Sequence, residues 1–476
     1  MRKSADEGTP LAGGSVKGDK LRPGGHTSVL GATAILATFS TTSSNVMFPR
    51  AYGVFGSLGG PLLGLALQGL MCVLTVLAVR IAVRFNCHTL GDLGRVLGGT
   101  WGGRVLSAGQ LVNQAVFMPV ALVLSADALK DVMLYAMRCT DATEAAPLDV
   151  GTCAWWACNV NPLWIILLFA WPVALLARNV GELAWSAYLS ILLILVQTAA
   201  ILYAAGSDDP KGDPAQLGPF LQLFGTTINP SWNLVIACLG AYLYSMCPLF
   251  IAVEVSASMQ QPAKIEMAVI LSTIFNTIVY VGTGLGVGLR WGAGMPNPIT
   301  DMISGVPDAI TNCILFYCTV LDFAICAAIV NREVQELWMP SFDRLCTLGN
   351  LPTWLIITLP SLIFALTLAL LTPKLDSLTG LLESLCIPLV MLFGVPGMLL
   401  LLRSRRGRAV TLDAPDESVA REMAALEMVQ GWEPALLAGV VLGIGLCIVL
   451  FAETVYSIAT TDFSGRFFCD VVASGG

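Results

Sequence analysis

The sequence predicts an all-α polytopic membrane protein with about eleven transmembrane helices, of which the first and the sixth are broken near the middle of the bilayer. Three observations lead to this prediction. The chain is 56% hydrophobic and only 12% charged over 476 residues, which is too apolar for a soluble protein of this length. Long apolar runs follow one another along the chain. Two of these runs are interrupted by polar residues or proline.

The first interruption is a run of six polar residues from Ser40 to Asn45, followed by Pro49. Proline cannot donate the backbone hydrogen bond that would reach the carbonyl of Asn45. In the sixth run, Pro248 releases the carbonyl of Tyr244 in the same way. Irregular backbone at membrane depth survives only where it is buried in protein or lines a watery cavity. We therefore predict two discontinuous helices around a cavity, as transporters have, with simple proline kinks as the alternative.

Eleven apolar segments are long enough to cross a bilayer. They form one expected transmembrane domain, 27–457, between a disordered cytosolic tail, 1–26, and a short extracytosolic tail, 458–476. The expected spans are 27–55, 58–83, 105–130, 162–178, 184–206, 232–256, 266–289, 308–330, 352–372, 377–402 and 433–457.

Lysine and arginine set the expected orientation of these spans. With the amino terminus in the cytosol, eighteen of these residues fall on the cytosolic side and six on the other side, as the positive-inside rule requires. Three cysteines then share one extracytosolic loop, so a disulfide among Cys139, Cys153 and Cys158 is a candidate, with its connectivity open.

The composition also narrows the function. A net charge of -7 without a basic block outside the loops argues against nucleic acid as a partner. The two histidines, His26 and His88, both lie outside the apolar runs, so histidine-based catalysis, a zinc site and haem have little support. We expect no enzyme, no structural metal and no organic cofactor. The glycine-rich segment 89–103 lacks the lysine and the preceding strand of a phosphate loop, so we expect a flexible gate or linker there.

Several motifs resemble those of one family. The first span reads Met47-Phe48-Pro49-Arg50-Ala51-Tyr52-Gly53, an apolar-proline motif before a glycine-rich turn. The end of the sixth span and the loop after it carry Glu254, Met259 and Pro262, an acid–methionine–proline pattern. Segments 89–94 and 280–288 are also similar, as is Pro396. With these motifs the chain resembles the amino acid/auxin permease family of the amino acid, polyamine and organocation superfamily.

The resemblance implies two inverted five-helix repeats plus one further helix, as in LeuT, and ion-coupled symport of an amino acid across the plasma membrane or a vacuole- or lysosome-like membrane. The sequence departs from the family where Thr41 and Ser43 replace glycines, where Arg50 replaces an uncharged residue and where Asp322 adds an acid. The hydroxyl residues Thr41 and Ser43 leave the backbone path at the first break, and the size of the substrate, open.

Helix dipoles suggest how a zwitterion would bind. The half-helix that starts after Asn45 offers free N–H groups to a carboxylate, and the one that ends near Tyr244 offers carbonyls to an ammonium group. The alternative is that the hydroxyls only bond back to their own helix. The expected binding residues are Thr41, Thr42, Ser43, Ser44, Asn45, Tyr244, Ser245 and Met246.

Further residues are candidates for coupling and gating. An aspartate inside a span is costly, so Asp322 with Thr319 is the candidate for ion coupling. It would carry a proton or hold Na⁺ near Thr41, since the superfamily shares a sodium-type site between the first and eighth spans; a structural acid is the alternative. Glu254 is the expected inner latch, with an interfacial role as the alternative, and Arg50 with Glu383 is the expected outer gate. We interpret Asn113 and Gln114 as hydrogen-bond partners of neighbouring helices, with a role in lining the binding site as the alternative.

Two other function classes remain open from the sequence. A non-transporting amino acid sensor of the same fold would have the same binding site, and only flux would separate it from a transporter. A membrane-embedded enzyme would need clustered histidine, aspartate or cysteine at membrane depth, and the spans lack such a cluster. The transporter is the preferred interpretation, with a small-molecule amino acid and the lipid bilayer as its expected partners.

Overall fold

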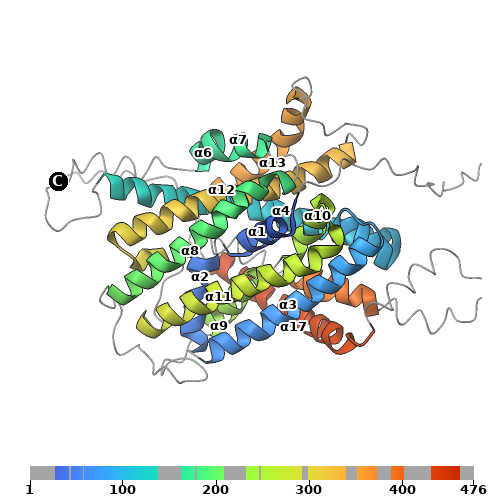
Figure 1. The fold of residues 1–476 in the computed structure, drawn as a ribbon, viewed down its shortest axis with the longest axis horizontal. Helices are drawn as coiled ribbons and strands as arrows, with labels where there is room; N and C mark the ends of the chain where they lie inside the picture. The colour runs from blue at the N-terminus through green and yellow to red at the C-terminus, as the bar shows by residue number, and fades with distance from the viewer. Residues whose placement is uncertain are drawn as a thin grey trace, which may run out of the picture.

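The architecture comes from a computed structural model. It describes residues 27–41, 44–56, 58–137, 162–176, 180–207, 232–245, 248–291, 299–338, 351–371, 387–400 and 430–460. Within these segments the protein is helical, apart from one parallel bridge between Thr27 and Met259. Most helices lie side by side along the long axis of the molecule (Figure 1).

Among the described residues, seven helices are long and apolar enough to cross a membrane, and four shorter apolar helices accompany them. The main elements, in chain order, are α1 Val29–Thr41, α2 Ser44–Phe55, α3 Gly59–Arg84, α4 Leu90–Ala136, α6 Pro162–Ile165, η1 Ile166–Ala170, α7 Trp171–Leu176, η2 Val180–Leu183, α8 Ala184–Ser207, α9 Trp232–Tyr244, α10 Leu249–Ser258, η4 Pro262–Lys264, α11 Ile265–Trp291, η6 Ile299–Met302, α12 Gly305–Trp338, α13 Leu351–Leu371, η9 Pro388–Gly394 and α17 Glu433–Thr460.

Both predicted helix breaks are present. The first helix stops at Thr41 and resumes at Ser44, and the sixth stops at Tyr244 and resumes at Leu249. Pro49 lies inside α2, one turn after the first break, where it removes the hydrogen bond to the carbonyl of Asn45. Pro248 stands directly before α10. The first break therefore falls within the polar run, with Pro49 inside the half-helix that follows, and the second falls at Pro248.

The half-helices next to the breaks form the centre of the bundle. In α10, every residue from Leu249 to Ser256 is buried, and in α1 the run from Ala34 to Thr41 is buried. Both lie in the middle of the ribbon in Figure 1. The outer helices expose much more of their apolar surface, since the most apolar stretch of α17 is only 22% buried. The broken backbone is thus enclosed by protein rather than exposed to hydrocarbon, as membrane burial requires.

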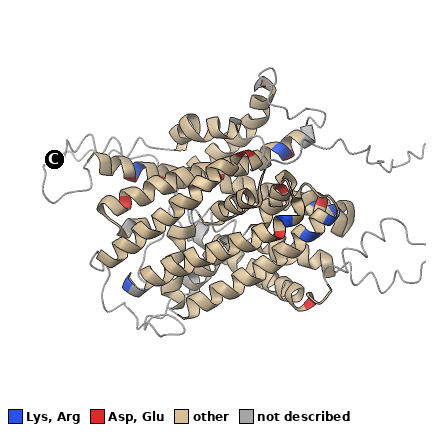
Figure 2. Cartoon of the chain, in the orientation of Figure 1, with Lys and Arg blue, Asp and Glu red and all other residues tan. Residues whose placement is uncertain are grey.

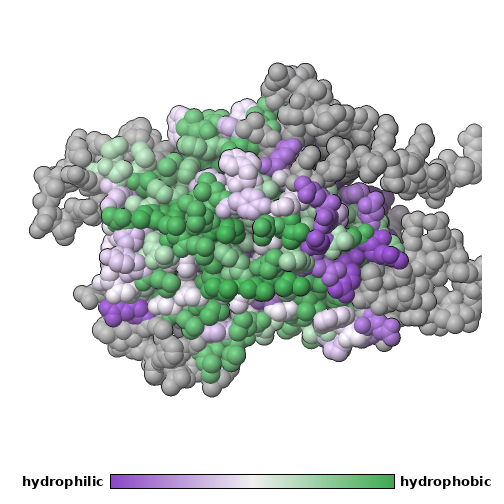
Figure 3. Space-filling model, viewed as in Figure 1, coloured by the Kyte–Doolittle hydropathy of each residue, from purple (hydrophilic) through white to green (hydrophobic). Residues whose placement is uncertain are grey.

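The surface has the pattern of a membrane protein. Figure 3 shows a broad apolar surface along the helices and hydrophilic side chains gathered at the right-hand end of the view. Figure 2 shows a group of Lys, Arg, Asp and Glu residues at the same end. The chain is an integral, multi-pass membrane protein, since it has several helices long and apolar enough to cross a membrane and, on the face in view, apolar side chains cover most of their length.

The expected linker at 89–103 is instead part of a helix, while a role of this segment as a gate stays a prediction. This segment is helical except at Gly98 and Gly99, where α4 is kinked and Gly99 has a φ of 66°. Thr89 caps the helix, since its hydroxyl accepts from the N–H of Asp92 while the Asp92 carboxylate accepts from the N–H of Thr89. The kink folds the two parts of α4 against each other, with Gly94 facing Gly102. Glycine here permits the turn and the close approach of two backbones.

Candidate functional site

The first break carries four deeply buried polar side chains. Ser40, Thr41, Ser44 and Asn45 are each at most 2% exposed. Within the described part of the chain, the hydroxyls of Ser40 and Ser44 and the side-chain carbonyl of Asn45 have no hydrogen-bond partner. Buried polar atoms are normally paired, so three unsatisfied groups at one helix break indicate a place for a polar ligand or water.

The other polar groups of this break bind to neighbouring helices. The Thr41 hydroxyl donates to the side-chain oxygen of Asn276 in α11 at 2.6 Å. The Asn45 amide donates to the side-chain oxygen of Gln197 in α8 at 3.1 Å, and Gln197 donates in turn to the carbonyl of Thr311 in α12 at 3.3 Å. These bonds hold the start of α2 to α8 and α12, and the end of α1 to α11.

The second break lies close to the first. The hydroxyl of Tyr280 in α11 donates to the carbonyl oxygen of Ser40 and lies 3.1 Å from the carbonyl oxygen of Ser245. Ser40 belongs to the last turn of α1, and Ser245 directly follows α9. One tyrosine therefore joins the carboxyl ends of the two broken helices. The Ser245 hydroxyl donates to the carbonyl of Ala241, one turn earlier, at 2.7 Å. For Ser245, the alternative that a hydroxyl bonds back to its own helix is therefore observed.

An aromatic cluster adjoins the breaks on the side of α2 and α9. The ring of Phe48 stacks on Tyr280 at 4.4 Å between centroids and meets the edge of Tyr242 at 4.6 Å. The rings of Tyr52 and Phe55 also pack against Tyr242. The Tyr242 hydroxyl donates to the carbonyl of Gly60 at 2.9 Å. These five side chains are each at most 9% exposed. The packed rings therefore fill this side of the breaks.

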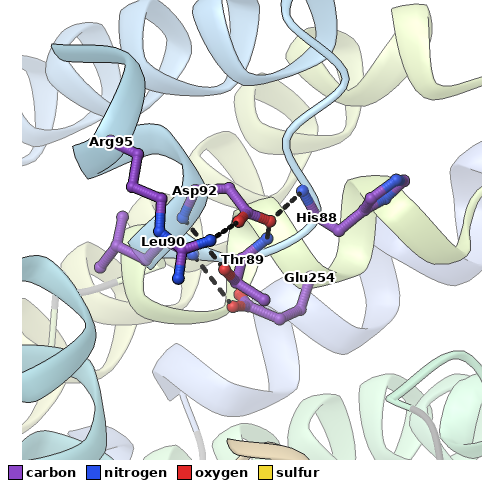
Figure 4. Close-up of polar contacts among 6 residues, drawn as sticks. All are labelled: His88, Thr89, Leu90, Asp92, Arg95 and Glu254. Carbon is purple, nitrogen blue, oxygen red and sulfur yellow. Dashed lines mark hydrogen bonds and ion pairs between the residues drawn. The ribbon is translucent and has the colours of Figure 1, made fainter. Parts of the chain in front are cut away.

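On the side of α1 and α10, Glu254 is the central polar group. Its Oε1 accepts from the Gln110 amide of α4 at 2.7 Å and from the backbone N–H of Leu90 at 3.4 Å. Figure 4 shows this carboxylate pointing to the start of α4, beside the cap formed by Thr89 and Asp92. Glu254 is 4% exposed and therefore does not reach into an interface as a snorkelling side chain would. The contact joins α10 to both parts of α4.

The candidate coupling residues lie on α12. Asp322 is 1% exposed. Thr319 lies one turn before it, and its hydroxyl is hydrogen-bonded to the hydroxyl of Ser125 in α4 at 2.7 Å. Thr319 also donates to the carbonyl of Leu315 in its own helix. Among the described residues, no group of three or more His, Cys, Asp or Glu side chains could hold a metal ion.

Some predicted residues fall outside the described part of the chain. Arg50 is half-buried in α2, but its expected partner Glu383 belongs to an undescribed segment. The backbone of Tyr244 ends α9, and its side chain is not described. The other expected residues outside the described ones are Thr42, Ser43 and Met246 at the breaks and Cys139, Cys153 and Cys158 of the candidate disulfide.

Most of the partners of the two breaks were not predicted from the sequence. Gln197, Asn276 and Tyr280 are separated from the first break by more than 150 residues, and each lies inside a long apolar run. The sequence feature that could have indicated them is their polarity, since an amide or phenol inside a membrane span needs a hydrogen-bond partner. The spacing of Phe48, Tyr52 and Phe55 at i, i+4 and i+7 could have indicated an aromatic face on α2.

Comparison with known proteins agrees with this architecture. The solved structure of MhsT in complex with L-phenylalanine matches with a TM-score of 0.58 and 14% identity, over 89% of this chain and 98% of MhsT. At this identity the likeness shows the fold, and it confirms the predicted LeuT-like arrangement. No curated protein matches the chain. The profile of a family described as transmembrane amino acid transporter protein matches residues 25–406. Because this match covers most of the chain, the protein belongs to the transmembrane amino acid transporter family.

Proposed function

We propose that this protein is a secondary active transporter that couples the uptake of an amino acid to the movement of a proton or Na⁺. The observation that carries the proposal is the meeting of the two helix breaks at Tyr280. Discontinuous helices that meet inside a membrane bundle present main-chain groups of both polarities to one small solute.

The amino acid would bind through its two charged groups. The start of α2 at Ser44 and Asn45 supplies free N–H groups and the positive end of a helix dipole for the carboxylate. The carbonyls of Ser40 and Ser245 supply acceptors for the ammonium group. A carbonyl oxygen has two lone pairs, so each can accept from the ligand while Tyr280 remains bound. The buried hydroxyls of Ser40 and Ser44 would complete the set.

Alternating access would operate between two closures. The aromatic cluster of Phe48, Tyr52, Phe55, Tyr242 and Tyr280 would close the site on one side. The contact of Glu254 with Gln110 and Leu90 would close it on the other. Opening either one exposes the breaks to one side of the membrane, which is the motion expected for this fold.

Asp322 is the proposed coupling residue. It is a fully buried acid in a membrane helix, and such residues commonly mark ion or proton pathways. Thr319 and Thr41 supply hydroxyl oxygens as further ligands should Na⁺ be the coupling ion.

Uptake into liposomes tests the proposal. The full-length protein is reconstituted, and the accumulation of each amino acid of a panel is measured under an imposed pH gradient, an imposed sodium gradient or neither. We expect concentrative uptake of at least one amino acid under one of the two gradients. Saturable binding without uptake under either gradient would contradict transport and indicate a sensor.

A further inference from the structure

Gln114 in α4 is buried and has no hydrogen-bond partner among the described residues. Its side chain is 0% exposed, and within the described part of the chain neither its Nε2 nor its Oε1 is bonded. A buried amide has two donors and an acceptor to satisfy, and leaving them unpaired is costly. Other glutamines in the bundle are bonded: the amide of Gln68 donates to the carbonyl of Thr273, and that of Gln197 to Thr311. Gln114 therefore requires a hydrogen-bond partner, such as a ligand or water, that the described part of the chain does not supply.

The neighbours of Gln114 on its helix show where this amide points. Gln110, Gln114 and Phe117 are spaced i, i+4 and i+7, so they share one face of α4. Gln110 donates to the carbonyl of Phe250 in the first turn of α10 at 2.7 Å. The ring of Phe117 stacks on Phe39 near the end of α1, with 5.1 Å between centroids. Gln114 lies between these two contacts and thus faces the place where α1 ends and α10 begins.

We propose that Gln114 determines substrate specificity by binding the side chain of the transported amino acid, which is neutral and carries a hydroxyl or an amide. The inference rests on the proposed transport function and names its substrate class. An amide both donates and accepts without charge, so it matches another hydroxyl or amide. The side chains bonded around the first break, those of Asn45, Gln197 and Asn276, are neutral as well.

The same chemistry disfavours other substrates. An apolar side chain would leave the Gln114 amide unpaired on binding, and a site built for hydrogen bonding rejects a ligand that cannot bond. An anionic side chain would enter a buried region of neutral amides with the Glu254 acid bound to Gln110 one turn away, so its desolvation would not be offset.

Pairs of amino acids with the same shape and different polarity test this inference. Uptake of threonine against valine, and of glutamine against methionine, is measured in liposomes that contain the full-length protein. We expect kcat/KM for the polar member of each pair to be about 10-fold to 100-fold higher, the range set by one unpaired buried polar group. In the Gln114→Met variant, which preserves length and removes the amide, we expect both ratios to fall close to one.

A matched control separates specificity from folding. Gln68 is 7% exposed, and its amide is bonded within the bundle, to Thr273 and Thr277 of α11. We expect Gln68→Met to reduce the amount of folded transporter while both ratios stay at their wild-type values. Because each ratio is measured within one preparation, lower expression of a variant does not change it.

The outcomes distinguish the two proposals. Wild-type protein that transports amino acids without preferring the polar members overturns the inference and leaves transport intact. The same holds where the preference survives in Gln114→Met. Wild-type protein that transports no amino acid overturns the proposed function and, with it, the substrate class. Should Gln114→Met fail to fold, thermal stabilisation of the wild type by threonine but not by valine supports the inference, and equal stabilisation overturns it.

Discussion

The hydroxyl of Tyr280 lies 3.1 Å from the carbonyl oxygen of Ser245 and also binds the carbonyl of Ser40. We expect Tyr280→Phe to remove the one O–H donor that the carbonyls of Ser40 and Ser245 share, which costs about 1–3 kcal/mol of stability. The two helix ends would also lose their common anchor. Uptake per folded molecule should fall at least tenfold, measured in liposomes against the amount of folded protein.

Tyr317→Phe is the control for this substitution. The Tyr317 hydroxyl bonds to Ser186 at 2.6 Å between α12 and α8, and neither residue belongs to the broken helices. We expect it to lower the melting temperature in detergent and to leave uptake per folded molecule unchanged. Equal losses of uptake in both variants would show that Tyr280 acts through general stability alone.

Asn45 and Gln197 form a buried pair between α2 and α8. In a double-mutant cycle with Asn45→Ala and Gln197→Ala, we expect a favourable coupling of about 0.6–2 kcal/mol, the range found for hydrogen bonds between membrane helices. The cycle is measured by unfolding in detergent. Strict additivity would mean that the pair does not hold α2 in place.

Asp322 offers a test of coupling. We expect Asp322→Asn to retain binding of the amino acid and to lose concentrative uptake under the coupling gradient, since an amide neither carries a proton nor bears the charge that binds Na⁺. Asp308→Asn, in the first turn of the same helix, is the control, and its uptake should keep the dependence on the gradient. Gradient-driven accumulation that persists in Asp322→Asn would remove Asp322 from the coupling mechanism.

The reactivity of the native Cys87 thiol reports whether the contact of Glu254 with Gln110 and Leu90 is closed. Cys87 precedes the α4 cap and is 6% exposed, and burial together with the charge of Asp92 raises the pKa of its thiol to about 12. The thiol is therefore protonated near neutral pH and should react slowly with maleimide. We expect Glu254→Ala to open this region and to accelerate the labelling of Cys87, identified by mass spectrometry.

Glu254→Gln is the matched variant, because its side-chain oxygen still accepts from Gln110 and from the N–H of Leu90. We expect it to label at nearly the wild-type rate. In every variant that keeps the region closed, labelling should rise as the pH increases from neutral, because the thiol with its raised pKa is deprotonated to a growing extent. Labelling of Glu254→Ala at the wild-type rate would contradict the role of Glu254 as a latch.

The two breaks could be predicted from the sequence because each depends on local chemistry. Pro49 and Pro248 remove specific backbone bonds, and the polar run at the first break cannot face hydrocarbon. The partners of the breaks could not be predicted, because the contacts of Thr41 with Asn276 and of Asn45 with Gln197 join helices far apart in the chain. Gln114 was interpreted as a partner of neighbouring helices, whereas its amide is unbonded within the described residues.

The segment around the α4 kink was predicted wrongly for a different reason. Its many glycines indicated flexibility, since glycine weakens a helix. The cap at Thr89 and the contact of Gly94 with Gly102 instead give it a defined helical fold. Glycine composition alone does not separate a mobile loop from a close backbone contact, because both need a residue without a side chain.

This contact makes a last prediction possible. A Cβ added at Gly102 would lie closer than 3.0 Å to the backbone oxygen of Gly94, and a backbone atom cannot rotate away. We expect Gly102→Ala to separate the two parts of α4 and to cost about 1–3 kcal/mol, as overpacking does. Gly69→Ala, in the middle of α3, is the control, because nothing lies within 4 Å of its added Cβ. Thermal unfolding in detergent should show a lower midpoint for Gly102→Ala and an unchanged or raised midpoint for Gly69→Ala, since alanine favours a helix. Equal midpoints for the two variants would mean that α4 is not closely packed at its kink. The kink would then not fix the position of Leu90, whose N–H donates to Glu254.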